Sequence, residues 1–190
     1  MTGVLLAGFC ALQLSFIWAR FKIFRIDGPA PPGVRLIEAS TLLCIVAGMV
    51  LIAGRGSDGL LLGAAAVLTG AASAALFAWA VRSVRPRQLT AAFSPDAPVE
   101  LLRSGAFGLV RNPFYLAYLL AHALPLLASR SLWGLVPLVW MALLYHRAAV
   151  LEERKFQAGP LAADYRRYAQ ATGRFLPRLS LGRKPSGESA

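Results

Sequence analysis

The chain has 190 residues, of which 57% are hydrophobic and only 15% charged, and its mean hydropathy is +0.57. This composition excludes an ordinary soluble globular domain and favours a polytopic membrane protein. A net charge of +11 would indicate nucleic acid binding in a soluble chain, but the same excess arises where cytoplasmic loops of a membrane protein carry Lys and Arg.

Five apolar segments follow one another along the chain. The first three, Thr2–Ala19, Leu36–Ala53 and Leu60–Val81, are long enough, at about 1.5 Å per residue, to cross or nearly cross a hydrocarbon core of about 30 Å. The last two, Phe114–Ser129 and Leu132–Tyr145, are shorter and so close together that they predict a tight helical hairpin. The sequence therefore predicts an all-α integral membrane protein with five transmembrane helices.

Lys and Arg are concentrated in three parts of the chain. Residues 20–35 hold four of them, residues 82–111 hold five and the residues from Arg147 onward hold nine, whereas Arg55 and Arg130 stand alone. By the positive-inside bias these three groups lie in the cytoplasm, with the N-terminus outside and the C-terminus inside. We therefore expect a protein of the cell (cytoplasmic) membrane, and its charge requires no nucleic acid partner.

Two polar clusters flank the predicted hairpin. The first is RNPFY, Arg111–Tyr115, in which Pro113 is well placed to open a helix because its missing N–H would be unpaired there anyway. The second is YHRAAVLEERKF, Tyr145–Phe156, which is followed by DYRRY at Asp164–Tyr168 and by RFLPR at Arg174–Arg178. A hairpin brings both clusters to one membrane face, where we expect the chemistry.

Two neighbouring glutamates stand out in the second cluster. If the last helix continues past Tyr145, Glu152 and Glu153 lie on adjacent stripes of it, roughly 100° apart, so we expect only one of them to face a given pocket. Glu152 is the stronger candidate, because it shares its stripe with Tyr145 and Phe156.

In their order along the chain, GAFGLVRNPFYLAY, LEER, DYRRY and RFLPR resemble the isoprenylcysteine carboxyl methyltransferase family and its relatives, the phospholipid methyltransferases. That family has a Gly-x-Tyr, an Arg-His-Pro-x-Tyr, a Glu-Glu pair and a Tyr-x-x-Tyr followed by a proline. The resemblance covers about Leu101–Arg178. It implies a membrane-embedded methyltransferase that uses S-adenosylmethionine as its cofactor.

The sequence departs from the family's pattern at two motif positions. Asn112 stands where the family usually has His, and Phe107 stands where it has Tyr. An amide donates and accepts hydrogen bonds but cannot shuttle a proton, so Asn112 suits a cofactor-orienting role and not an acid–base role. The stretch between Glu153 and Tyr165 is also slightly longer and is broken by a proline.

The residue types in the two clusters suit the parts of S-adenosylmethionine. A carboxylate can accept from ribose hydroxyls, Arg can bind the α-carboxylate, and aromatic faces suit the adenine and the sulfonium cation. No Gly-x-Gly-x-x-Gly lies between a strand and a helix, so the Rossmann mode of binding is not expected. We expect cofactor binding by Arg111, Asn112, Tyr115, Glu152, Glu153 and Tyr165, catalytic roles for Arg111, Asn112 and Arg147, and no metal.

The expected organisation is one membrane-embedded domain, residues 1–190. Residues 1–81 form a three-helix scaffold, residues 82–113 a cytoplasmic loop, and residues 114–190 the hairpin and the cytoplasmic tail that form the cofactor site. His122 lies in the middle of a predicted membrane segment, where it is either a functional ionisable group or a neutral imidazole bonded to a neighbouring helix.

Three functional hypotheses follow. The first is methyl transfer to a carboxylate of a lipophilic, isoprenoid-like molecule at the cytoplasmic membrane face. The second is N-methylation of a phospholipid amine, which requires the ammonium to lose a proton first, so Asn112 in place of His favours the carboxylate. The third is a non-enzymatic membrane protein that has kept the fold. The expected partners are the lipophilic substrate and the lipid bilayer.

Overall fold

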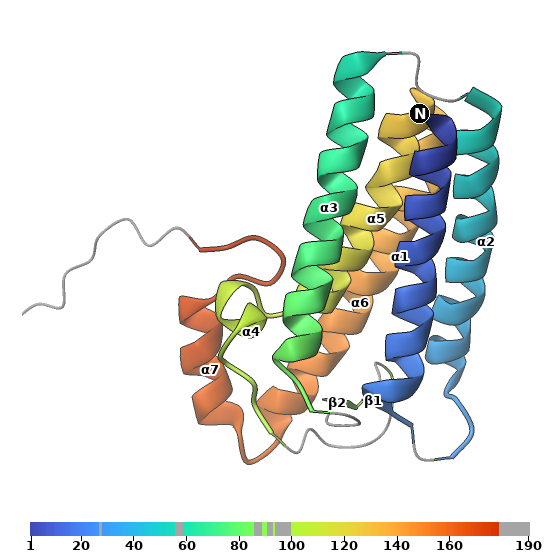
Figure 1. The fold of residues 1–190 in the computed structure, drawn as a ribbon. Coiled ribbons are helices and arrows are strands. Elements are labelled where there is room, and N and C mark those ends of the chain that lie inside the picture. The colour runs from blue at the N-terminus through green and yellow to red at the C-terminus, as the bar shows by residue number, and fades with distance from the viewer. Residues whose placement is uncertain (27, 56–58, 86–88, 91–92, 94–99, 179–190) are drawn as a thin grey trace, which may run out of the picture.

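The computed structural model describes residues 1–26, 28–55, 59–85, 89–90, 93 and 100–178. Within these residues the long helices run side by side as a bundle (Figure 1): α1 (Thr2–Lys22), α2 (Pro32–Arg55), α3 (Leu60–Arg82), α5 (Pro113–Ser129) and α6 (Leu135–Ala158). The shorter elements are β1 (Phe24–Arg25), β2 (Leu89–Thr90), α4 (Ala106–Leu109), the 3₁₀ helix η1 (Leu132–Gly134) and α7 (Ala162–Ala171).

Four of the described helical segments are long and apolar enough to cross a membrane: Thr2–Lys22, Pro32–Gly54, Leu60–Arg82 and Leu132–Ala158. Apart from the parallel pair of two-residue strands, β1 and β2, all regular structure in the described chain is helical. The prediction of a helical membrane protein is confirmed at this level.

The helix α5 lies at the centre of the bundle. It packs against α1, α2, α3 and α6. Its Ala117, Ala121 and Ala128 are completely buried, and such small residues let neighbouring helices approach closely. With 17 residues, α5 is about 25 Å long, less than the hydrocarbon core of about 30 Å. Because other helices surround it, α5 is shielded from lipid over most of its surface.

The predicted hairpin of α5 and α6 is present, and it closes tightly. Arg130 adopts a left-handed conformation, with φ of 53°, at the end of α5. A Cβ atom on Gly134 would lie 2.5 Å from Cα of Leu126, so only glycine lets η1 pack this closely against α5. The turn lies at residues 130–134, at the junction of the two apolar segments from which the hairpin was predicted.

The helix α6 extends well beyond the predicted segment. It ends at Ala158 and not at Tyr145, because Leu, Glu, Arg, Lys and Gln, which dominate residues 151–157, are good helix formers whether or not lipid surrounds them. Because of this extension, Glu152 and Glu153 lie on α6 near the end of the bundle where α4 and α7 are found (Figure 1).

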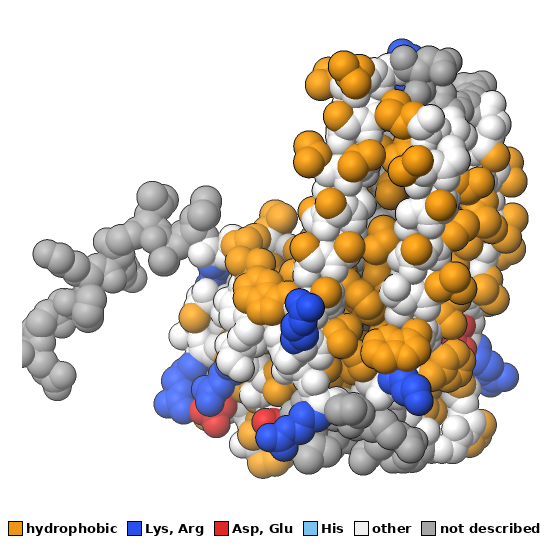
Figure 2. Space-filling view, viewed as in Figure 1, with side chains coloured by type: hydrophobic (Ala, Val, Ile, Leu, Met, Phe, Trp, Pro, Cys, Tyr) orange, Lys and Arg blue, Asp and Glu red, His pale blue; other side chains and the backbone are white. Residues whose placement is uncertain are grey.

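Charged side chains gather at that same end. Figure 2 shows orange hydrophobic surface along the bundle and most of the visible Lys and Arg near β1, β2 and α7. Arg20 and Lys22 lie in the last turn of α1, and Arg82 ends α3. The side chain of Arg130 lies at the opposite end, with Nη1 3.7 Å from the position of a Cβ atom on Gly59. Basic residues at the ends of α1 and α3 thus lie at one end of the bundle and Arg130 lies at the other.

Candidate functional site

A cavity of about 90 Å³, lined by charged and aromatic side chains, lies at the charged end of the bundle, and we call it the polar cavity. Its walls come from β1, β2, the segment that contains α4, the start of α5, the end of α6 and α7. All six residues that the sequence predicts to bind the cofactor line this one cavity: Arg111, Asn112, Tyr115, Glu152, Glu153 and Tyr165. The structure therefore brings together residues that lie up to 54 positions apart in the sequence, from 111 to 165.

Backbone pairing holds the start of α5 against the C-terminal segment. Val110 forms a parallel bridge with Gly173, and the amide of Arg111 donates to the Gly173 carbonyl at 2.8 Å. Both the amide and the side-chain Nδ2 of Asn112 donate to the carbonyl of Arg174, at 3.2 and 3.4 Å. The predicted RNPFY cluster and the RFLPR cluster thus form one unit.

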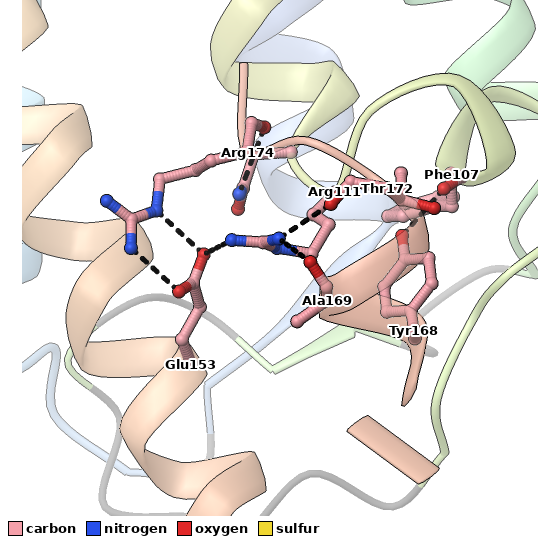
Figure 3. Close-up of polar contacts among 8 residues, drawn as sticks. Phe107, Arg111, Glu153, Tyr168, Ala169, Thr172 and Arg174 are labelled. Atoms are coloured by element: carbon pink, nitrogen blue, oxygen red, sulfur yellow. Dashed lines mark hydrogen bonds and ion pairs between the residues drawn. The ribbon is translucent and has the colours of Figure 1, made fainter. Parts of the chain in front are cut away.

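Arg111 ties three chain segments together. Its Nη1 donates to the carbonyl oxygens of Ala169 and Thr172, at 3.0 and 2.6 Å, and its Nη2 donates to Glu153 at 3.1 Å (Figure 3). Carbonyls at the C-terminal end of a helix carry partial negative charge, so the guanidinium also stabilises the end of α7. Arg111 therefore has a structural function in addition to lining the cavity.

Glu153 pairs with two arginines at once. Nε and Nη2 of Arg174 donate to its two carboxylate oxygens, both at 2.8 Å, and Arg111 approaches from the other side (Figure 3). The Glu153 and Arg111 side chains are each only 11% exposed. The hydrogen bonds to Glu153 raise the pKa of Arg174 above its ordinary value. One carboxylate thus holds two guanidinium groups, Arg111 in the cavity wall and Arg174 behind it.

Glu152 forms a different contact. Its carboxylate accepts a 2.6 Å hydrogen bond from the hydroxyl of Tyr115, whose ring stacks on Tyr145 at 5.1 Å. Glu152 and Glu153 both line the same cavity, so the prediction that only one of them faces a pocket is wrong. The two side chains do leave α6 in different directions, but the cavity is wider than one stripe of that helix.

Two buried polar atoms in the cavity wall have no hydrogen-bond partner among the described residues: Nε of Arg111 and the hydroxyl of Tyr165. Tyr165 is 3% exposed, and burial raises its pKa, so the hydroxyl stays protonated and able to donate at neutral pH. Leaving a buried donor unpaired is costly, typically about 1–3 kcal/mol. Unpaired donors that converge on one cavity are typical of a site that a polar ligand completes.

Arg147, which the sequence predicts to be catalytic, is not among the residues that line this cavity. Its side chain is exposed on the surface of α6. The adjacent Ala148 and Ala149 are completely buried against the bundle, and the turn of the helix directs Arg147 away from them. His122 is buried beside Tyr145, with ring centres 6.5 Å apart, and is not part of the cavity lining.

Some lining residues were not predicted from the sequence. Phe24 and Leu89 reach the cavity through the pairing of β1 with β2, and the sequence gives no sign of that pairing. Arg174, which holds Glu153, lies in the RFLPR motif but was not assigned a role. A role for Arg174 could have been predicted from the sequence, because it is a basic residue in a polar segment that follows the two glutamates.

A second, larger cavity of about 310 Å³ lies between α1 and α2. This volume falls at the lower end of the roughly 300–1,000 Å³ that is typical of small-molecule sites. Tyr115, Tyr118 and Tyr145 form its inner wall. Its other lining residues are mostly apolar: Phe16, Ile17, Arg20, Phe21, Phe24, Val34, Ile37, Glu38, Thr41 and Leu42. We call it the apolar cavity.

The two cavities adjoin, because Phe24 and Tyr115 belong to the walls of both. Phe21 and Leu42, in the wall of the apolar cavity, are 70% and 59% exposed on the surface of the bundle. The arrangement therefore places the site for a polar ligand at the charged end and the space between α1 and α2 on either side of Phe24 and Tyr115. No protein-family model and no curated protein matches this chain.

Proposed function

We propose that this protein is an S-adenosylmethionine-dependent methyltransferase that methylates a carboxylate of a lipophilic, isoprenoid-like molecule at a membrane face. The observation that carries this proposal is the contact of a polar cavity with an apolar one across Tyr115. A reaction between a polar cofactor and a lipid-borne acceptor needs such a junction. The resemblance of residues 101–178 to the isoprenylcysteine carboxyl methyltransferases supplies the type of reaction.

The side chains of the polar cavity fit the chemistry of this cofactor. The unpaired donors of Arg111 and Tyr165 suit a carboxylate or an ether oxygen, and Glu152 suits ribose hydroxyls. Phe156, which stacks on Tyr165 at 5.0 Å, offers an aromatic face for a base or a cation. At about 90 Å³ the cavity is smaller than a typical ligand site, so a ligand of this size must widen it or extend beyond it.

When bound, S-adenosylmethionine supplies a methyl group on a positively charged sulfur. An acceptor carboxylate is already ionised at neutral pH, so the protein needs no base and mainly has to align the reactants and exclude water. Asn112 serves this task, since its amide holds the Arg174 carbonyl and does not titrate. Glu153, which accepts from two arginines, keeps the cavity wall in place.

We also propose that α5 is a fifth membrane crossing and that the charged end of the bundle lies in the cytoplasm of a cell with this protein in its cytoplasmic membrane. Eighteen of the twenty Lys and Arg residues fit this topology. The enclosure of α5 by four helices explains how a helix of 17 residues crosses without matching the full hydrocarbon thickness.

The proposal is tested by titrating the protein, in lipid nanodiscs, with S-adenosylhomocysteine. We expect saturable binding to the wild type and weaker binding, by about tenfold, to Tyr165→Phe, which removes a donor that has no partner among the described residues. Arg147→Gln, on the outer face of α6, is the matched control and should bind like the wild type. Absence of binding to the wild type would reject the methyltransferase.

A further inference from the structure

An ion pair lies in the wall of the apolar cavity, at the charged end of the bundle. Nε of Arg20, in the last turn of α1, donates to Oε1 of Glu38 on α2 at 2.8 Å. Both side chains line the cavity, and the Arg20 guanidinium also lies 5.6 Å from the centre of the Phe21 ring. The proposed methyl transfer gives this pair no function.

The Arg20–Glu38 pair is built differently from the Arg174–Glu153 pair. Arg174 grips both oxygens of a carboxylate that is 11% exposed, whereas Arg20 contacts a single oxygen of a carboxylate that is 41% exposed. Two-pronged and buried contacts are strong, while single contacts near solvent contribute little. Glu38 is therefore a partner that Arg20 can exchange for another carboxylate.

We propose that Arg20 recognises the acceptor: it releases Glu38 and binds the carboxylate of a lipophilic acid whose apolar chain fills the cavity between α1 and α2. The position supports this, because Phe24, four residues beyond Arg20 in the chain, lies in the walls of both cavities. The aromatic and aliphatic lining suits a single hydrocarbon chain, and a planar guanidinium suits a carboxylate. Binding of the acid does not depend on the cofactor, although the role of Arg20 in a reaction rests on the proposed function.

The exchange also explains how a product would leave. In the proposed reaction one carboxylate oxygen forms a bond to the methyl carbon while the carbon–sulfur bond breaks and its electron pair stays on sulfur, giving an uncharged ester and an uncharged thioether. An ester carries no negative charge, so it holds Arg20 far less strongly than the acid does. The Arg20–Glu38 ion pair then forms again. Arg20 thus distinguishes the acid from its ester by charge.

The test is a binding experiment without cofactor. A farnesylated carboxylic acid that carries a photoreactive diazirine is crosslinked to the protein in phosphatidylcholine nanodiscs, in competition with the unlabelled acid or its methyl ester. The crosslinked peptides should come from α1 and α2. We expect the acid to compete at a concentration at least about tenfold lower than the ester, the size expected for a charged hydrogen bond.

Three variants sharpen the result. Arg20→Gln should remove the preference for the acid, whereas Glu38→Gln should strengthen binding of the acid and leave the ester unchanged, a gain that misfolding cannot produce. Lys22→Gln is the matched control, because it removes a positive charge from the same end of α1 at an exposed position outside the cavity lining. Nanodiscs that contain phosphatidylglycerol should not displace the acid, which separates a bound acid from an anionic lipid headgroup.

Equal competition by acid and ester in the wild type would overturn the assignment, and so would a preference that persists in Arg20→Gln. Displacement by phosphatidylglycerol would instead assign Arg20 to lipid headgroups. Since no cofactor is present, these outcomes are independent of the titration with S-adenosylhomocysteine. If the protein binds the acid but not S-adenosylhomocysteine, the proposed methyltransferase function is rejected, while the assignment of Arg20 to the acid still stands.

Discussion

The hydroxyl of Tyr115 donates a 2.6 Å hydrogen bond to Glu152, and the ring of the same tyrosine forms part of the wall between the polar and the apolar cavity. A carboxylate of the candidate cofactor site is thus fixed directly to the residue that borders the candidate acceptor site. Any change at Glu152 acts at this junction, which makes it the most informative position to alter.

Glu152→Gln is expected to weaken binding of S-adenosylhomocysteine by about tenfold, because an amide accepts hydrogen bonds from ribose hydroxyls less strongly than a carboxylate does. The Tyr115 hydroxyl can still donate to the amide oxygen, so the unfolding temperature should change little. Calorimetric titration in nanodiscs measures the affinity. The exposed Arg154→Gln, two positions further along α6, is the control, and an unchanged affinity in Glu152→Gln would show that Glu152 does not contact the cofactor.

Glu153→Gln is expected to destabilise the protein by about 3 kcal/mol, the lower end of the range for a broken buried ion pair, since Arg174 is 30% exposed. The cause is the two guanidiniums that lose their shared carboxylate. Unfolding in detergent, followed by circular dichroism, measures the change. Asp164→Asn breaks a mainly exposed pair with Arg167 and should leave the unfolding midpoint unchanged. A Glu153→Gln variant as stable as the wild type would contradict this account of the ion pairs.

Tyr168→Phe should lower stability at neutral pH by about 1 kcal/mol, because the hydroxyl donates a 2.6 Å hydrogen bond to the Phe107 carbonyl. Burial raises the pKa of Tyr168. The fold therefore favours the neutral phenol, and its contribution is complete below about pH 10 and is lost as the pH rises above that value. The stability difference between wild type and variant should narrow in alkali.

The control for this experiment is Tyr165→Phe, since the Tyr165 hydroxyl has no hydrogen-bond partner in the described chain. That variant should be at least as stable as the wild type at neutral pH, because it removes a buried donor that has no partner among the described residues. If the stability difference between wild type and Tyr168→Phe grows with pH, the fold does not favour the neutral phenol of Tyr168.

Turnover should be nearly independent of pH between roughly 6.5 and 8.5, because a carboxylate acceptor is ionised throughout this range. Asn112 adds no titrating group, and Asn112→His should keep substantial activity while introducing a step near the histidine value of about 6.5. The assay follows methyl transfer from labelled S-adenosylmethionine into lipid, with mild alkali to release methanol from a methyl ester. Alkali-stable label and a rate that rises about tenfold per pH unit would favour amine methylation instead.

The proposed topology predicts which surface positions a membrane-impermeant thiol reagent reaches. In a background with Cys10 and Cys44 replaced by Ala, Ser104→Cys should react only from the cytoplasmic side and Leu132→Cys only from outside. Both side chains are exposed in the structure. Positions 57 and 94, which the sequence suggests for the same purpose, lie outside the described residues. Reaction of Ser104→Cys from outside would reverse the orientation and remove the cofactor site from the cytoplasm.

The parts of this structure that depend on local sequence were predictable. Apolar runs marked the membrane helices, and the polar clusters around the hairpin marked six residues of one cavity, because a hairpin necessarily returns the chain to the same end of a bundle. The outward direction of Arg147 was not predicted, since the buried residues next to it are the small Ala148 and Ala149, which mark an inward face less clearly than large apolar residues do.

Contacts between segments that are distant in the chain could not be predicted from the sequence. The grip of Arg174 on Glu153 and the bridge between Val110 and Gly173 depend on where the chain goes after α7. The apolar cavity arises from the spacing of α1 and α2, whose lining residues are ordinary membrane-helix residues when read singly. The Arg20–Glu38 pair can be recognised as part of a candidate binding site only when the cavity beside it is known.

The bridge between Val110 and Gly173 joins two segments that are synthesised at very different times. Arg111 and Glu153 are both translated before residues 173–174 exist, so for that interval the start of α5 lacks its backbone partner and Glu153 lacks one of its two arginines. Helices that enter the bilayer as they emerge form the bundle first. The wall of the polar cavity is therefore completed only after residues 173–174 have been synthesised, when the sequence of every long helix in the described chain is already in place.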